Sequence, residues 1–208
     1  LTPIFLSELS HFDSDIERVT GQRLYNEFGL TKPMNWTAGF LQPTIKYRSV
    51  NYELDRPFTY IENSPNAGSL MASLDGGLIF ERQTSFFGQS MTQTLEPRLY
   101  YLYSQYEEQI FQPDFDTAEL TFSYGQLFRD TRFSGNDRLD DANQLSVGVT
   151  SRYFDNETGE EKLSVSLGQI YYFRDREVRL NAFDPELVEN TSPLAGEFSW
   201  SPNPKWQL

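Results

Sequence analysis

The chain has 208 residues and a formal net charge of −13, with no cysteine and one histidine, His11. This length suits one domain and at most two. The composition excludes disulfides, thiolate metal sites and histidine-rich metal sites, and the acidic charge disfavours a surface that binds nucleic acid.

Nine runs with alternating apolar and polar residues predict strands. They span residues 3–12, 22–32, 37–52, 68–83, 91–104, 117–125, 143–155, 161–174 and 194–201. An alternation with a period of two is typical of a sheet with one apolar and one polar face. The 15% aromatic content and the scarcity of lysine also favour strands over helices.

Turn residues separate these runs. Short turns are expected at 32–35 and 155–159, and longer connections at 53–67, 105–116, 126–142 and 175–193. Long and short connections should alternate between the two ends of an up-and-down sheet, yet 105–116 and 126–142 are consecutive and both long. The pattern therefore leaves open which connections share one end of the sheet.

The expected fold is an all-β, antiparallel up-and-down transmembrane β-barrel, with about nine strands in this chain. Several runs reach the roughly 9–11 residues that a tilted strand needs to cross a bilayer, and aromatic residues gather near the ends of runs, as at membrane interfaces. A soluble β-sandwich is the alternative. Charged side chains on the polar faces are candidates for a lumen-facing surface: Lys46, Arg48, Asp75, Glu81, Arg98 and Arg152.

Residues 127–143 combine three arginines with four aspartates in a predicted connection. The simpler interpretation is a network of ion pairs that folds a long loop onto its sheet. The functional interpretation is an element that contacts a partner or an anionic ligand. The candidate residues for either role are Arg129, Asp130, Arg132, Asp137, Arg138 and Asn143.

Motifs of catalysis are missing from the sequence. It contains no Gly-x-Ser-x-Gly elbow, no Walker-type phosphate loop and no His-Glu-x-x-His zinc motif. We therefore expect neither an enzyme, nor a cofactor, nor a metal site.

Several ordered blocks resemble the LptD family of lipopolysaccharide-assembly proteins, also called organic solvent tolerance proteins. The resemblance is strongest over about 91–174 and weaker at both ends. It rests on residues 93–103, 127–130, 135–138, 141–145, 148–152 and 168–173.

This resemblance implies a component of the translocon that inserts lipopolysaccharide into the outer leaflet of the outer membrane of a Gram-negative bacterium. The implied partners are lipopolysaccharide, the plug lipoprotein LptE, outer-membrane lipid and, through a periplasmic domain, the LptA bridge. The resemblance also implies that about nine strands are a fragment of a larger barrel, so residues 1–208 are expected to be part of a barrel domain, without the periplasmic domain and gate strands; both chain ends look cut from a longer protein. A small complete barrel without a lipopolysaccharide role and a soluble β-sandwich binding module are the alternatives.

Overall fold

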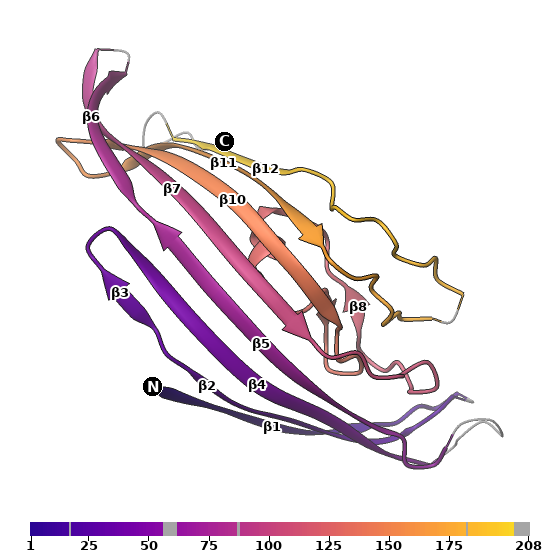
Figure 1. The fold of residues 1–208 in the computed structure, drawn as a ribbon. Helices are drawn as coiled ribbons and strands as arrows, with labels where there is room; N and C mark the ends of the chain where they lie inside the picture. Colours follow the sequence, from indigo (N-terminus) through magenta and orange to yellow (C-terminus); the bar gives the residue numbers. More distant parts are fainter. Residues whose placement is uncertain (17, 56–61, 87, 182, 202–208) are drawn as a thin grey trace.

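The computed structural model describes residues 1–16, 18–55, 62–86, 88–181 and 183–201. In these residues no helix is long and apolar enough to cross a membrane. The elements of Figure 1 are β1 (Thr2–Phe12), β2 (Gly21–Thr31), β3 (Met34–Trp36), β4 (Gly39–Leu54), β5 (Asn66–Leu78), β6 (Phe80–Phe86), β7 (Gln89–Ser104), β8 (Ala118–Glu119), the 3-10 helix η1 (Tyr124–Phe128), β9 (Phe133–Ser134), β10 (Ala142–Asp155), β11 (Glu161–Tyr172) and β12 (Ala195–Trp200).

One antiparallel sheet contains all the long strands, in the order β1-β2-β4-β5-β7-β10-β11-β12. Strand β3 pairs with β4 beyond the end of β2, and β6 pairs with β7 beyond the end of β5. The predicted all-β, up-and-down fold is therefore confirmed. Among the described residues, β1 and β12 do not pair with each other, so the sheet is open, as expected for a fragment of a larger barrel.

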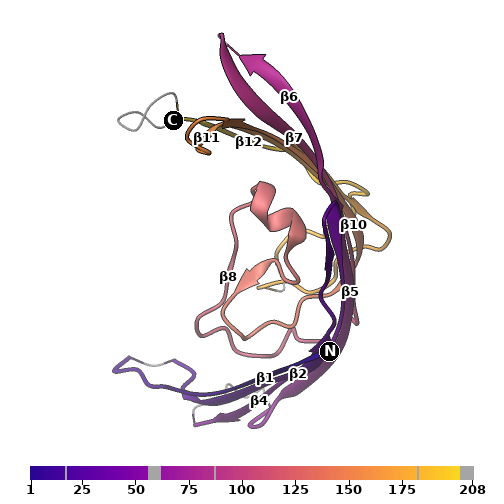
Figure 2. The same cartoon turned by 90° about the vertical axis from the view of Figure 1, so that its left-hand side faces the viewer.

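The sheet is strongly curved, and Figure 2 shows β8 and η1 on its concave side. The second sheet of the described residues is only the two-stranded ladder of β8 and β9. A β-sandwich, in which two sheets pack face to face, is not formed by this part of the chain.

The two faces of the sheet differ in polarity because successive side chains of a strand point to opposite sides. Charged side chains such as Lys46 and Arg98 point to the concave face, where they meet residues 105–141. The alternate positions on the convex face hold large apolar side chains that are exposed, among them Phe5, Leu24, Phe28, Ile45, Leu70, Leu74, Leu99, Val147, Leu167 and Phe198. A continuous exposed apolar surface of this kind marks a contact with lipid or with another protein.

Connections of two lengths alternate along the chain (Figure 1). At one end of the sheet, β3 and β4, β6 and β7, and β10 and β11 are joined by at most five residues. The opposite end carries the long connections 13–20, 55–65, 105–141 and 173–194. This arrangement shows which connections share an end of the sheet, and the consecutive long connections expected at 105–116 and 126–142 are parts of one connection, 105–141.

Two sequence predictions are corrected by the structure. The strand expected at 117–125 is wrong, because this segment lies inside the single connection 105–141 and contains only β8 and the start of η1. The turn expected at 32–35 is also wrong, since β2 and β3 both pair with β4 and the chain reverses only at 37–38. Pro33 has no N–H to donate, which is why it interrupts a strand here.

Candidate functional site

The connection 105–141 is seated on the concave face by a notch of two glycines. Gly148 of β10 and Gly168 of β11 are cross-strand neighbours. A Cβ at Gly148 would come within 2.7 Å of the Phe128 ring, and one at Gly168 within 2.5 Å of Leu127. Leu127 is fully buried there. Because Gly148 and Gly168 have no side chains, the sheet has space at these positions for Leu127 and Phe128 of η1.

A buried ion cluster fastens the other part of this connection to β2. The Asp137 carboxylate is 0% exposed and accepts hydrogen bonds from Arg23 Nη1 at 2.7 Å and from the Tyr52 hydroxyl at 2.9 Å. The backbone N–H groups of Phe115 and Asp116 donate to its other oxygen at 2.8 and 3.0 Å. Arg23 is only 1% exposed and also contacts Asp116 and Glu8.

Hydrogen bonds decide the charge state of Asp137. Burial by itself would raise the pKa of the Asp137 carboxyl, but the N–H of Asp116, the guanidinium of Arg23 and the N–H of Phe115 hold that pKa below its usual value. The carboxylate is consequently ionised at neutral pH, and its charge is matched by Arg23.

Lys46 and Arg48 of β4 hold the middle of the connection. Lys46 Nζ donates to Asp130 Oδ2 at 2.9 Å and lies 3.0 Å from Glu27 Oε1. Arg48 is buried and donates to Ser104 Oγ at 2.8 Å and to the Asp140 carbonyl at 3.2 Å. Burial acts to raise the pKa of Asp130, yet the charge and hydrogen bond of Lys46 lower it overall.

The other predicted lumen-facing residues also lie on the concave face. Arg98 donates to both carboxylate oxygens of Asp75, at 2.9 and 2.6 Å, and its guanidinium lies 4.1 Å from the centre of the Phe128 ring. Arg152 lies 3.3 Å from Glu96 and 3.1 Å from Glu161. Glu81 is exposed on the same face, opposite Thr94.

Arg132, Arg138 and Asp141 join the connections 105–141 and 173–194 into one layer. Arg132 donates to Asp140 Oδ1 at 2.8 Å and to the carbonyl of Val178 at 3.0 Å. The Arg138 guanidinium is held by five main-chain carbonyls, those of Gln112, Pro113, Asp137, Arg179 and Leu180. Asp141 accepts from the backbone N–H groups of Glu177 and Val178 and from Arg174.

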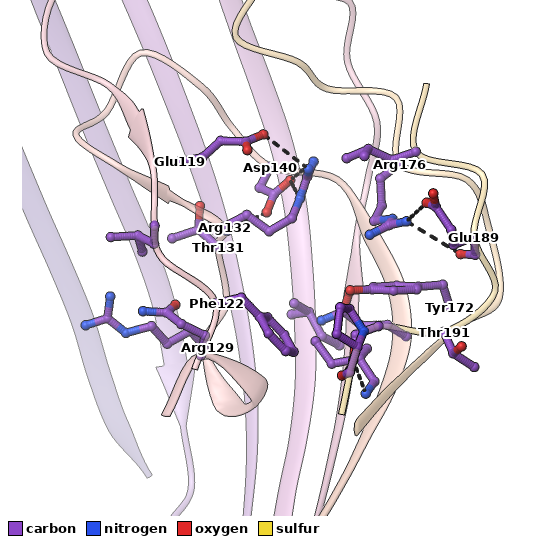
Figure 3. Close-up of a pocket in the computed structure, with 18 residues that line it drawn as sticks. Glu119, Phe122, Arg129, Thr131, Arg132, Asp140, Tyr172, Arg176, Glu189 and Thr191 are labelled. Atoms are coloured by element: carbon purple, nitrogen blue, oxygen red, sulfur yellow. Dashed lines mark hydrogen bonds and ion pairs between the residues drawn. The ribbon is translucent and has the colours of Figure 1, made fainter. Parts of the chain in front are cut away.

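A cavity of about 490 Å³ lies between this layer and the sheet (Figure 3). Its apolar lining includes Leu102, Leu120, Phe122 and Ile170. Ion pairs border it, with Arg132 beside Asp140 on one side and Arg176 beside Glu189 on the other. The Arg176 guanidinium is 3.7 Å from the centre of the Tyr172 ring. The cavity is thus apolar inside, with paired charges at its border.

Two of the predicted network residues stand apart from these contacts. Arg129 is exposed, and no hydrogen bond or ion pair joins its guanidinium to the described residues. Asn143 lies on the convex face, where its side-chain oxygen accepts from the Tyr101 hydroxyl at 3.0 Å. Its neighbours Ala142 and Gln144 are buried on the concave side, so the alternation of β10 directs Asn143 outward.

Sequence reasoning missed Arg23, Tyr52, Asp116 and Arg176 as members of the site. For Arg23 and Tyr52 a signal existed, because both occupy the polar-face positions of their strands. Which acid of a distant connection meets Arg23 depends on how the chain folds between two residues that are 114 positions apart. Local alternation contains no information about that pairing.

The fold and these contacts define a class of protein: a wall segment of a transmembrane-type β-barrel, with an apolar convex face and its own connection folded onto a charged concave face. The family model described as "LptD: LPS transport system D" matches residues 4–208, and the chain belongs to this family.

Relatives carrying the name LPS-assembly protein LptD support this assignment. The one from Hahella chejuensis is 40% identical over 97% of this chain and 26% of its own length. The relative from Xanthomonas euvesicatoria pv. vesicatoria is 48% identical over 91% of this chain and 25% of its own length. That from Pseudomonas aeruginosa is 40% identical over 90% of this chain and 24% of its own length. The chain therefore spans about a quarter of the curated relatives that it matches.

Proposed function

We propose that this chain is a wall segment of the outer-membrane translocon that inserts lipopolysaccharide into the outer leaflet of a Gram-negative outer membrane. The single observation that carries the proposal is the opposite polarity of the two faces of one sheet, found in a chain of the LptD family. Residues 1–208 then supply part of the barrel domain. The periplasmic domain and the gate strands belong to other parts of the full-length protein.

An amphipathic glycolipid needs two environments on its way across a membrane: a wet polar path for its sugars and an apolar one for its acyl chains. A sheet with period-two faces offers both. The convex face contacts outer-membrane lipid, and the concave face borders the polar path, with the connection 105–141 occupying part of it. This is a transport and assembly role without a covalent step.

The orientation in the membrane follows from the connections. Transmembrane barrels carry short turns on the periplasmic side and longer loops on the extracellular side. We therefore place the turn between β10 and β11 in the periplasm and the connections 105–141 and 173–194 at the cell surface. The layer formed by these two connections then closes the concave space from outside.

The partners follow from the family resemblance. We propose lipopolysaccharide as the cargo, the lipoprotein LptE as a plug facing the concave side, and the LptA bridge as a contact of the periplasmic domain. The charged concave face supports a polar protein partner inside the barrel, because Glu81, Asp75 and Arg152 keep exposed or half-buried charges there.

Depletion of the full-length protein tests this function. We expect lipopolysaccharide accessible to an impermeant probe at the cell surface to fall as the protein is depleted, and to recover when the wild-type gene is supplied. Depletion of an unrelated outer-membrane barrel is the control for general membrane damage. Unchanged surface lipopolysaccharide would instead favour a small barrel without this role.

A further inference from the structure

We propose that the convex face binds one phospholipid of the periplasmic leaflet, with an acyl chain in a hollow at Gly76 and the phosphate at Arg82. This lipid site rests on the proposed function, which places the convex face in the membrane. Three features support it: the shape and lining of the hollow, its depth along the strands, and a cation where the apolar surface ends.

The hollow has a volume of about 410 Å³ and lies over β4, β5 and β7. Its lining includes Trp36, Leu74 and Leu99, and among the described residues none that lines it carries a charge. The Tyr101 hydroxyl, which also belongs to the lining, donates to Asn143 at 3.0 Å. A space of this size is in the range of ligand sites, and a lining of this kind accepts a hydrocarbon chain.

Gly76 forms the floor of the hollow. Its cross-strand neighbours are Leu41 of β4 and Leu99 of β7, and the next convex positions along β5 are the exposed Leu74 and Leu78. Leucines therefore surround a position that has no side chain. A Cβ at Gly76 would lie 3.1 Å from Leu41 Cδ1, the end of a flexible side chain, so a larger residue can be introduced here to fill the hollow.

The depth of the hollow matches the end of an acyl chain. The convex positions of β5 and β6 are apolar from Leu70 to Phe80, and this apolar band ends at Arg82, six positions after Gly76. At about 3.3 Å per residue and a tilt of about 40°, six positions correspond to a depth of about 15 Å. Half of the hydrocarbon core is also about 15 Å thick. An acyl chain whose headgroup lies beside Arg82 therefore reaches Gly76.

Arg82 places a positioned cation at this edge of the apolar band. Arg82 Nε donates to Gln93 Oε1 at 2.7 Å, and Gln93 Nε2 donates to Ser151 Oγ at 2.9 Å. The two Nη groups of Arg82 have no acceptor among the residues that the structure describes. Arginine binds phosphate through paired N–H donors, so these groups suit the headgroup of a phospholipid.

The position of Arg82 selects the leaflet. Figure 1 shows the hairpin of β6 and β7 extending past β3 at the end of the sheet that carries the short turns. The proposed function assigns this end to the periplasm. A lipid whose headgroup lies at the opposite surface cannot place its phosphate beside Arg82, so we assign the hollow to a phospholipid of the periplasmic leaflet.

Lipids compete with one another for an apolar wall, because contact with the protein brings no hydrophobic gain inside a bilayer. Preference for one site therefore comes from packing in the hollow and from the phosphate contact. One cation near an anionic lipid surface raises local lipid occupancy about fivefold.

Photocrosslinking tests this site in the full-length protein with its physiological partners, reconstituted into vesicles. The probe is a phosphatidylglycerol with a photoreactive group at the end of one acyl chain. Mass spectrometry compares the labelling of Leu99, at the hollow, with that of Leu167, an exposed convex residue two strands from Pro97 in the same cross-strand row. We expect about fivefold more label at Leu99.

Two pairs of variants identify the parts of the site. Gly76→Leu fills the hollow and should lower the labelling of Leu99 to that of Leu167. The matched control Ala72→Leu adds the same side chain to the same face of β5 outside the hollow and should leave the labelling unchanged. Arg82→Ala should also remove the difference, whereas Arg82→Lys should retain it. Because Arg82 is exposed, this second pair tests the site even if Gly76→Leu fails to assemble.

Several outcomes overturn the site. Equal labelling of Leu99 and Leu167 in the wild-type protein removes it and leaves the proposed function intact. A difference that survives Gly76→Leu in assembled protein shows that the hollow does not hold the chain, and one that survives Arg82→Ala removes the phosphate contact. Stronger labelling of Leu99 by a lipopolysaccharide probe assigns the hollow to the opposite leaflet. If neither residue is labelled by either lipid, the convex face does not contact lipid and the proposed function fails as well.

Discussion

Removal of the buried charge at Asp137 gives the sharpest test of how the connection 105–141 is held. In Asp137→Asn one oxygen becomes an NH₂ group, which faces donors: the guanidinium of Arg23 or the N–H groups of Phe115 and Asp116. Breaking a buried ion pair from one side costs about 3–5 kcal/mol. Because Arg23 keeps Asp116 and Glu8 as partners, we expect the lower end, about 3 kcal/mol.

Native-state hydrogen exchange of the full-length protein measures this loss locally. A reduction of about 3 kcal/mol in the free energy of opening corresponds to about 100-fold faster exchange. The effect should be centred on the amides of Phe115 and Asp116, which donate to Asp137, while the central amides of β7 remain protected.

Asp116→Asn is the matched control, because the Asp116 side chain contacts the same Arg23 but is 43% exposed. Water reaches the half-exposed Asp116 carboxylate, and the buried Arg23 keeps Asp137 and Glu8 as partners. We therefore expect a loss of about 1 kcal/mol, so exchange around residues 113–119 should accelerate about fivefold. If the two variants exchange equally fast, the ion cluster does not anchor the connection and the reasoning above is refuted.

Three further predictions follow from the same contacts. Gly148→Val fills the space of the Phe128 ring and should make residues 119–132 cleavable by an added protease in otherwise assembled protein; unchanged resistance argues against the glycine notch. On the convex face, Leu99→Arg should destabilise the membrane-inserted protein by about 2–4 kcal/mol. The control Glu81→Arg on the concave face should leave heat stability nearly unchanged. Equal effects of the two substitutions would contradict the assignment of the faces. The folded pKa of Asp137 is lowered, so its contribution to stability is present above its unfolded pKa of about 3.9 and is lost as the pH falls through the folded pKa. Pepsin should therefore cut residues 105–141 faster as the pH falls below about 4. The Asp137→Asn variant should not show this acceleration.

Pattern reasoning was accurate where one strand determines its own structure. The run 143–155 became β10 (Ala142–Asp155), and the run 91–104 became β7 (Gln89–Ser104). In such runs the alternation of side chains predicts a β-strand, and contact of one face of that strand with the rest of the protein stabilises it in the same register. The alternation also predicts correctly that Lys46 and Arg98 lie on one face and Ile45 and Leu99 on the other.

The same pattern failed in residues 117–125. Leu120, Phe122 and Tyr124 alternate with polar residues as a strand would, but they lie in the connection that folds onto the sheet. Tyr124 packs against the cluster of Leu127 and Ile170 and occupies the space at Gly148. Leu120 and Phe122 line the cavity between the connection and the sheet. Tertiary contacts can override the preference of a short segment for a strand when its apolar side chains pack against a neighbouring sheet instead.

The sequence by itself determined the class of fold, the polarity of the two faces and the prominence of residues 127–143, because period-two alternation and local clusters of charge are properties of neighbouring residues. Only the tertiary structure decided that Asp137 meets Arg23, that Asp130 meets Lys46, and that Arg129 remains without a partner among the described residues. Those pairings join residues more than 80 positions apart. They depend on strand order and on how a 37-residue connection returns to the concave face, which no local pattern specifies.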